Sequence, residues 1–485
     1  MHSIFRFLVL LPFLTIAGGT CNPSIITFVP LHTYYMAASG CNDSNSGTSS
    51  GSPWCTPHHS VVCGDVIYAA PGSYSAKNLG LGEWGAVSSC PSTSGGIDGT
   101  GGIYAAQLIC NGNVGTCSVT SSTQEAIRVD VSNWAVQGWQ ASTNTYIWGT
   151  CFWAIPTAAA TIHDIYFVND IANGCEASGF SVAPKAVGQS VDYFGVVGSI
   201  AYNTAKAGSK CYSGISVYEP YNSDTNAGTH IFIAGNISYD NKVPIGCGSG
   251  VNTDGNGIIF DDFGGTQSGQ AAYTGQAVAE QNLTFGNSMS GIAIGGNSNP
   301  RSSMYIFNNS AYGNDSETYN PYGGGEFLTY AVTANVYVYN NIFESTTYAY
   351  TVTGHMTNGG TTQYDFGVRN YGAGSAMTIA GNYIYNTVSS SGYTINVSPA
   401  GFNFGTNTTS SPGFASPFFS ANAPSCGAYT TTIACMVSII ADFKPSGGAA
   451  NYGYQPPTTC TSDSYFPSHM KGLVPAGLIT KPCNM

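Results

Sequence analysis

The stretch GNGIIFDDF at residues 255–263 recurs upstream as SGISVYEP at residues 213–220 and downstream as SGIAIGG at residues 290–296. Each copy starts at a glycine and continues as a short strand of alternating side chains. Alternation turns two sets of side chains inward, namely Ile215, Ile258 and Ile292, followed by Val217, Phe260 and Ile294. Copies of one strand predict a sheet in which equivalent residues stack in columns.

A second pattern repeats at irregular intervals through the same region. An apolar strand leads into Asn or Gly, then small and aromatic residues, then a polar end, in GSIAYNT (198–204), GNISYDN (235–241), QNLTFGN (281–287), NNSAYGN (308–314), NNIFEST (340–346) and GNYIYNT (381–387). Helical periodicity is nearly absent. We predict an all-β right-handed parallel β-helix, a solenoid with insertions on one face. A β-propeller would need more regular blades, and an antiparallel sandwich would need hairpin turns.

The chain divides into three segments. Residues 1–20 have the pattern of a secretory signal, because an apolar run too short to span a bilayer ends in small residues. Residues 21–425 are expected to form the solenoid with its N-terminal cap, and residues 426–485, rich in Cys and Pro, a C-terminal cap over the last coil. We expect an extracellular monomer without a transmembrane segment. A lipid anchor at Cys21 is disfavoured, because no Leu lies three positions before it.

Fifteen cysteines in an exported chain favour disulfides over metal thiolates. They lie toward the two ends, and none falls between Cys247 and Cys426. We therefore predict disulfide-rich terminal caps, with Cys21 as the unpaired thiol of the odd total.

Charge and aromatic content restrict the partners. Charged residues make up 7% of the chain, and the net charge is -12 with only 12 Lys and Arg. Nucleic acid is excluded, since its binding needs a basic surface. A polyanionic substrate would need a cation between it and the protein. Aromatic residues make up 13% of the chain and suit sugar stacking.

The stacked columns predict a candidate site. They place Tyr218 beside Asp261 and Glu219 beside Asp262, next to the open space above Gly295, and Asp254 precedes the same strand. Carboxylates this close need a divalent cation or a shared proton. We predict Asp254, Asp261, Asp262 and Glu219 as ligands of Ca²⁺, which prefers oxygen. With a proton instead, one carboxyl would be the general acid of a glycosidase. Asp254, Asp261 and Asp262 are also ordinary residues for a turn and a strand end.

Residues 33–74 (TYYMAASG to GDVIYAAPGSY) resemble the first coil of secreted pectate-lyase-like β-helix proteins. This resemblance implies Ca²⁺-assisted proton abstraction beside a uronate carboxylate, with Lys or Arg as the base. Lys242 is the preferred base and Arg301 the second, ahead of Lys206, Lys210 and Arg369. Tyr218 could donate a proton or pack under a sugar, and His230 could bind substrate.

The motif NTDG at residues 252–255, followed by Asp261 and Asp262, resembles the polygalacturonase family of β-helix hydrolases. The resemblance implies paired Asp residues acting in hydrolysis. The spacing departs from that family, whose two motifs lie about one coil apart, and the GHG and RIK motifs are missing.

Together these patterns predict a secreted carbohydrate-active enzyme that cleaves an acidic, uronate-containing polysaccharide by Ca²⁺-assisted β-elimination. A polygalacturonase-like hydrolase is the alternative. A non-catalytic solenoid that binds glycans or a surface is the third hypothesis.

Overall fold

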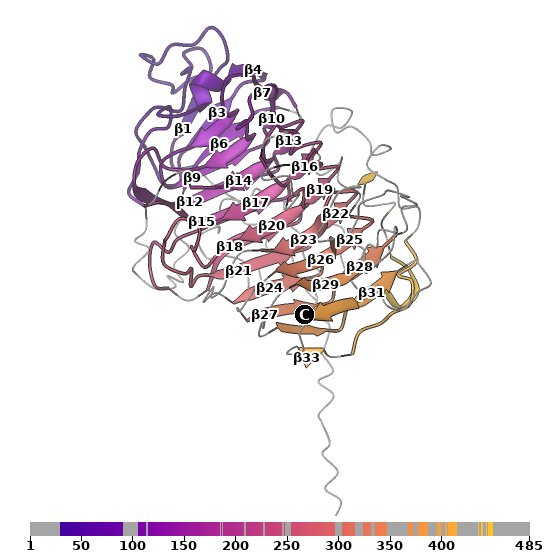
Figure 1. Ribbon diagram of the computed structural model, residues 1–485. Helices are drawn as coiled ribbons and strands as arrows, with labels where there is room; N and C mark the ends of the chain where they lie inside the picture. Colours follow the sequence, from indigo (N-terminus) through magenta and orange to yellow (C-terminus); the bar gives the residue numbers. More distant parts are fainter. Residues whose placement is uncertain are drawn as a thin grey trace, which may run out of the picture.

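The computed structural model describes residues 30–90, 105–112, 115–184, 186, 188–207, 210–226, 228–244, 247, 254–295, 303–315, 324–330, 335–346, 367–371, 377–386, 395–398, 403–404, 406–414, 435, 438–439, 443 and 445–449. Within these ranges the fold is a solenoid of three long sheets whose strand pairs are all parallel (Figure 1). Between residues 106 and 398 each coil contributes one strand to each sheet, and the next coil repeats the order.

Sheet 1 contains β1 (Thr33–Met36), β3 (Val66–Ala69), β6 (Ala106–Cys110), β9 (Trp134–Gln137), β12 (Ala160–Val168), β15 (Gln189–Val197), β18 (Thr229–Ala234), β21 (Gln276–Glu280), β24 (Met304–Phe307), β27 (Val336–Tyr339), β30 (Met377–Ala380) and β33 (Asn403–Phe404). Sheet 2 contains β4 (Gly72–Ser75), β7 (Cys117–Ser121), β10 (Gln140–Thr143), β13 (Ile171–Asn173), β16 (Ile200–Tyr202), β19 (Ile237–Tyr239), β22 (Leu283–Phe285), β25 (Ser310–Tyr312), β28 (Ile342–Ser345) and β31 (Tyr383–Asn386).

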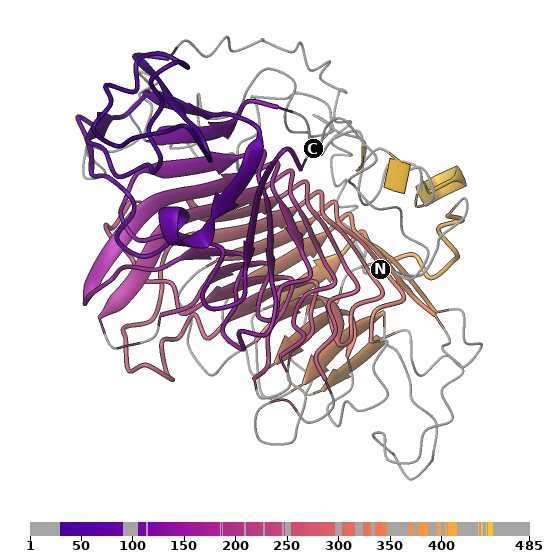
Figure 2. The ribbon, with the colours of Figure 1, turned by 90° about the horizontal axis from the view of Figure 1, so that it is seen from above.

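Sheet 3 contains β8 (Ile127–Val129), β11 (Phe152–Ala154), β14 (Phe180–Val182), β17 (Ile215–Tyr218), β20 (Ile258–Asp261), β23 (Ser290–Ile294), β26 (Gly325–Tyr330), β29 (Val368–Tyr371) and β32 (Ile395–Ser398). A small separate sheet pairs β2 (Val61–Val62) with β5 (Val87–Ser88), and two short 3-10 turns are η1 (Ala76–Leu79) and η5 (Gly447–Ala449). Figure 2 shows the sheets wrapping around one shared interior.

The inward columns are those predicted from the sequence. Ile215, Ile258 and Ile292 pair in register and are fully buried, and the second inward column packs beside them. Stacking equivalent aliphatic side chains coil after coil builds one continuous core. The expected parallel β-helix is therefore confirmed by its own strand pairing.

Two ladders of buried asparagines fix the turns of the central coils. In the first, Asn236, Asn282 and Asn309 follow one another, each donating through its side-chain amide to the amide oxygen of the next. The second ladder runs from Asn241 through Asn287 to Asn314 and ends on the carboxylate of Glu326. These are the Asn positions of the sequence repeat. The ladders satisfy polar groups that the turns bury, which stabilises the central coils, where no cysteine follows Cys247 until Cys426.

Five disulfides are described, and they confirm the prediction of disulfides over metal thiolates. The pairs are Cys41–Cys55, Cys63–Cys90, Cys110–Cys117, Cys151–Cys175 and Cys211–Cys247. Cys435 is also disulfide-bonded. Cys21 lies outside the described residues. Within those residues, no helix is long and apolar enough to cross a bilayer.

The cap that residues 426–485 are expected to form over the last coil stays a prediction, because the structure describes only a few residues of this C-terminal segment. Its described residues Cys435, Ile439 and Phe443 pack on the outer face of sheet 2, where the Phe443 ring lies 4.7 Å from that of Phe285 on β22. The reason is that sheet 2 presents an apolar outer face that needs a cover. This part of the segment is therefore a flank of the solenoid.

Candidate active site

A cavity of about 860 Å³ lies over the outer face of sheet 3, between β11 and β26. Its floor is the outward column that runs in register through Trp153, Ser181, Ser216, Ile259, Ala293 and Leu328. Loops that join sheet 2 to sheet 3 form one wall, which includes Lys210, Tyr212 and Asp254. The opposite wall contains Tyr218, Asp261 and Gln267. We call this cavity the sheet 3 cleft.

Tyr218 and Asp261 lie side by side at the ends of β17 and β20, as the sequence predicted. Both line the cleft. Beyond them Gly295 leaves an opening, because a Cβ there would lie 3.0 Å from Asp261 Oδ1. The missing side chain leaves room beside this carboxyl group at the end of the cleft.

Asp254 enters the cleft from the loop before β20. The Oγ of the buried residue Ser213 donates to Asp254 Oδ1 at 3.1 Å. The next residue, Gly255, has a φ of 90°, and a Cβ on it would lie 1.8 Å from Ser288 Oγ. Only glycine permits this turn. The Asp-Gly pair thus delivers a carboxylate to the wall facing Asp261.

The environment raises the pKa of Asp261 to about 8. Burial is the largest cause, followed by the negative charges of Asp254 and then Asp262. Asp261 therefore carries its proton at neutral pH. A protonated carboxyl and a carboxylate that line the same cleft can act as an acid–base pair.

Glu219 and Asp262 do not join that pair in the cleft. Both are buried and have left-handed backbones, with φ of 46° and 43°. Their carboxylates accept hydrogen bonds from the loop after β20, at Thr266, Gln267 and Ser268. The left-handed residue at the strand end turns each side chain away from the outward column, which strict strand alternation could not predict.

Ca²⁺ takes six to eight oxygen ligands. Of the four carboxylates predicted to hold it, only Asp254 and Asp261 line the cleft. The residues present therefore do not form a complete protein cage, and no step below depends on an ion.

The predicted base lies elsewhere. Lys242 is about half exposed, pairs with Asp240 at 2.8 Å and is not part of the cleft. Arg301 lies outside the described residues, as do Asn252 and Thr253. Lys210 is the basic residue among those lining the cleft, although the sequence ranked it lower. The Cys211–Cys247 disulfide ties its loop to the chain shortly before Asp254. Cys211 lies next to Lys210 in the sequence, but cysteine spacing alone does not reveal its partner.

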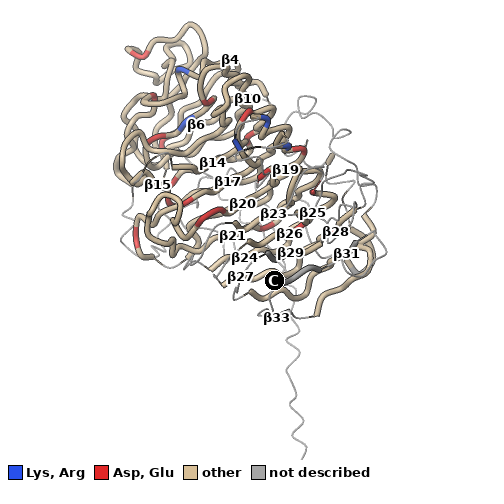
Figure 3. Tube along the Cα trace, in the orientation of Figure 1, with Lys and Arg blue, Asp and Glu red and all other residues tan. Residues whose placement is uncertain are grey.

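Apart from Tyr218, no aromatic side chain was assigned an individual role from the sequence. Trp148 and Trp153 line one end of the cleft and Tyr330 the other. Lys210 Nζ lies 5.2 Å from the Trp148 ring centroid, and the Arg128 guanidinium lies 5.2 Å from that of Trp153. Charged residues are otherwise sparse along the chain (Figure 3), which makes this group stand out.

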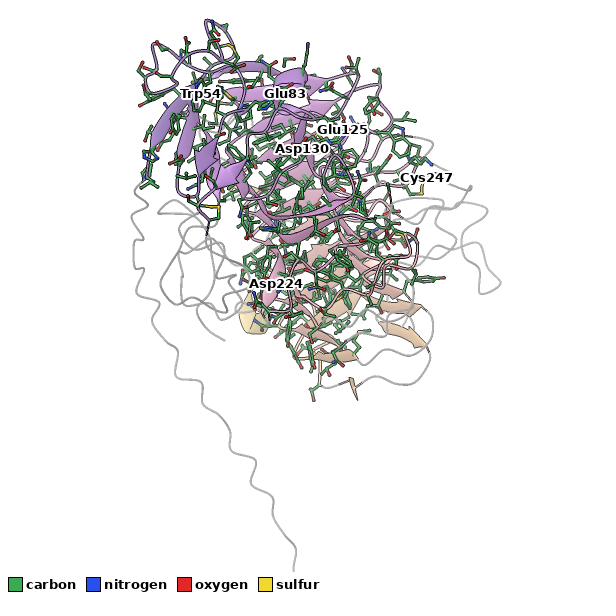
Figure 4. The ribbon with its side chains drawn as sticks, turned by 90° about the vertical axis from the view of Figure 1, so that its left-hand side faces the viewer. Trp54, Glu83, Glu125, Asp130, Asp224 and Cys247 are labelled. Carbon is green, nitrogen blue, oxygen red and sulfur yellow. A yellow bond between two sulfur atoms is a disulfide. The ribbon has the colours of Figure 1, made fainter. Side chains whose placement is uncertain are left out.

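His230 belongs to a different polar group, on the outer side of sheet 1. Its Nδ1 lies 3.0 Å from Asp192 Oδ1, and the Tyr273 hydroxyl donates to the same oxygen at 2.5 Å. Asp192, Asp224 and His230 have the spacing of metal ligands. Hydrogen bonds from Ser223, Tyr193 and Asn226 already occupy the two carboxylates. Figure 4 shows Asp224 and Cys247 on opposite sides of the solenoid, so this group is separate from the cleft wall that Cys247 supports.

Comparisons with known proteins give structural likeness only. No family and no curated protein matches the chain. Among solved structures, pectate lyase Pel9A is 15% identical, with 80% of this chain and 84% of that chain covered and a TM-score of 0.36. The periplasmic alginate epimerase AlgG is 11% identical, with coverage of 74% and 79% and a TM-score of 0.33. The PL6 family polysaccharide lyase Pedsa3628 from Pseudopedobacter saltans is 11% identical, with coverage of 81% and 95% and a TM-score of 0.27.

Proposed function

We propose that this protein is an exported carbohydrate-active enzyme that cleaves glycosidic bonds of an acidic polysaccharide in the sheet 3 cleft. The observation that carries the proposal is the pair of carboxyl groups in that cleft, Asp261 with its proton and Asp254 with its charge. The disulfides support an oxidising compartment outside the cytoplasm.

The shape of the cleft suits a linear polymer. Its floor crosses six neighbouring strands, so at about 4.8 Å between strands it extends for roughly 24 Å along the solenoid axis. Trp148 at one end and Tyr330 at the other are each 40% exposed and offer faces on which sugar rings stack. Several sugar units can therefore lie in the cleft with the carboxyl pair between the aromatic ends.

The chemistry supported best is acid–base hydrolysis. Asp261 would transfer its proton to the glycosidic oxygen as the bond to the anomeric carbon breaks. Asp254 would stabilise the developing positive charge and then either attack the anomeric carbon or remove a proton from the attacking water. Ser213 holds Asp254 in place through its hydroxyl group.

Lys210 supports an acidic substrate. With a net charge of -12, most of the protein repels a polyanion, so the single lysine of the cleft is the point where a sugar carboxylate would be attracted. The stacking of Lys210 on Trp148 places that charge beside a ring platform. One anionic sugar would therefore be held at this end.

A second candidate is β-elimination, favoured by the same lysine. In this reaction Lys210, in its uncharged form, would take the proton from the carbon beside the uronate carboxylate. The bond from the neighbouring carbon to the glycosidic oxygen would break, and Asp261 would give its proton to that oxygen. Hydrolysis ranks first because it needs only the two carboxyl groups that the cleft provides.

The test is incubation with a panel of uronate polymers and neutral glucans, with and without a chelator. Hydrolysis gives new reducing ends without the ultraviolet absorbance of an unsaturated uronate, and elimination gives both. Loss of activity on chelation would establish the metal. Binding without any product, unchanged in Asp261→Ala, would overturn the enzyme and favour the non-catalytic solenoid.

A further inference from the structure

The loop at residues 263–268, which follows β20, reaches the rim of the sheet 3 cleft. Gln267 is the residue of this loop that lines the cleft, on the same wall as Tyr218 and Asp261. The sequence gives no pattern that singles it out. We call residues 263–268 the rim loop.

Two carboxyl groups hold the backbone of the rim loop. The Gln267 N–H donates to Asp262 Oδ2 at 2.7 Å and to Glu219 Oε1 at 3.1 Å, and the Ser268 N–H donates to the same Glu219 oxygen at 2.7 Å. The Thr266 hydroxyl lies 2.9 and 3.0 Å from the two oxygens of Asp262. These bonds come from two successive coils and converge on the residue that enters the cleft.

Glu219 and Asp262 are also joined to each other. Both side chains are at least nine-tenths buried, at 1% and 0% exposure, and Glu219 Oε2 accepts no conventional hydrogen bond. Burial raises the pKa of Glu219, and its contact with the Asp262 side chain raises it further. Tyr218 and Asp261 are the other titratable groups that face this pair. Through its hydrogen bonds to the rim loop, the pair is an anchor made of two residues that follow the cleft strands directly.

We propose that Gln267 binds substrate and that Glu219 and Asp262 are the pair that positions it. The proposal rests on the proposed function, in that the sheet 3 cleft is taken as the substrate site. In this proposal Glu219 and Asp262 take no part in the reaction. They hold Gln267, and with it a side-chain amide, at the rim of the cleft. A primary amide both donates to and accepts from sugar hydroxyl and carboxylate groups.

The kinetic test compares Gln267→Ala, Glu219→Ala and Glu219→Gln with the full-length wild-type protein. Gln267→Ala should raise KM about tenfold with a smaller change in kcat, the effect of one or two lost hydrogen bonds. Glu219→Ala should raise KM similarly. Glu219→Gln should restore wild-type KM, because it keeps the length of the side chain and its amide oxygen still accepts from the rim loop.

The outcomes separate a positioning role from a direct one. If Glu219→Gln loses kcat as severely as Asp261→Asn, then Glu219 acts on the substrate itself and the proposal is wrong. An unchanged KM in Gln267→Ala would remove the binding role.

A measurement without substrate keeps this proposal distinct from the enzymatic one. Amide hydrogen exchange of the rim loop should be faster in Glu219→Ala and unchanged in Glu219→Gln. If no polysaccharide is cleaved by the wild type, the proposed function fails, while the exchange result still decides whether the pair holds the loop. Equal exchange in all three proteins would overturn the positioning pair.

Discussion

The ammonium group of Lys210 lies over the indole ring of Trp148, 5.2 Å from its centroid, at one end of the sheet 3 cleft. The contact fixes a flexible side chain with its charge toward the substrate site and its stem against an aromatic surface. The basic group of the cleft is thereby kept in one place.

Lys210→Met should lower kcat/KM on an acidic polymer by about 10- to 100-fold, because the variant loses the only Lys or Arg charge among the lining residues. The wild-type rate should fall as salt is added, and the variant should respond less. Lys242→Met is the matched control, since that lysine pairs with Asp240 outside the cleft. Equal losses in both variants would mean that overall charge, and not this site, attracts the polymer.

The Cys211–Cys247 disulfide should matter for binding as well as for stability. Replacing both cysteines by serine should cost about 2–5 kcal/mol of unfolding free energy and raise KM, because the loop that carries Lys210 and Tyr212 loses its tie. The control removes Cys41–Cys55, which belongs to the N-terminal cap. That change should lower stability and leave KM unaltered. A rise in KM in this control would show that the Cys211–Cys247 disulfide has no specific role in binding.

The fold could be predicted from the sequence because its two periodic patterns act locally. Alternation in SGISVYEP and GNGIIFDDF set the inward columns, and a repeated Asn marked the turns where Asn236 and Asn282 now form a ladder. Each coil repeats the same physical constraints, so a few aligned copies determined the register. Phe443, which packs against sheet 2, is far along the chain from Phe285. No repeated pattern in the sequence indicated that these two residues would meet.

The candidate site could be predicted only in part. The pairing of Tyr218 with Asp261 followed from register alone. Glu219 and Asp262 are themselves left-handed residues at the ends of their strands. The alternation of side chains along a strand therefore cannot predict where they point. The choice of Lys210 over Lys242 depends on a disulfide whose pairing spacing does not reveal.

The end of the second asparagine ladder gives a stability prediction. Asn314 donates its backbone N–H to Glu326 Oε1 at 3.0 Å and its amide to Oε2 at 2.5 Å. Glu326→Gln should lower the unfolding free energy by about 1–3 kcal/mol, because an amide nitrogen would replace one of two buried acceptors. Denaturant titration measures the change.

Glu344→Gln is the control for that substitution. Burial raises the pKa of Glu344 to about 7, so a neutral amide replaces a group that is already partly protonated at neutral pH. This variant should be as stable as the wild type. If both variants lose the same free energy of unfolding, the hydrogen bonds of Glu326 to Asn314 do not stabilise the protein specifically.

The buried pair of His230 and Asp192 predicts a pH dependence of stability. Burial lowers the pKa of His230, but the Asp192 carboxylate outweighs it and raises that pKa above 6.5. Burial by itself would raise the pKa of Asp192, but the hydrogen bond to His230 and the positive charge of that histidine lower it below 3.8. The histidine's share of stability is thus complete below pH 6.5 and is lost as pH rises past its raised pKa. The aspartate's share is complete above pH 3.8 and is lost as pH falls through its lowered pKa.

Thermal unfolding of His230→Gln across pH 4 to 9 checks this pair. The variant should be less stable than the wild type by roughly 3–5 kcal/mol near pH 5, since it leaves a buried carboxylate without its charged partner, and the difference should shrink toward pH 9. A difference that is constant with pH would show that packing alone is responsible.

The most direct test is the pH dependence of kcat/KM on an acidic polysaccharide for the wild type and Asp261→Asn. If Asp261 is the proton donor, the wild-type value should be lost as pH rises above about 8, where this carboxyl ionises. Asp261→Asn should fall about 10²- to 10⁴-fold at every pH while keeping its fold by circular dichroism. A wild-type value that stays level to pH 10, or an active Asp261→Asn, would contradict the account.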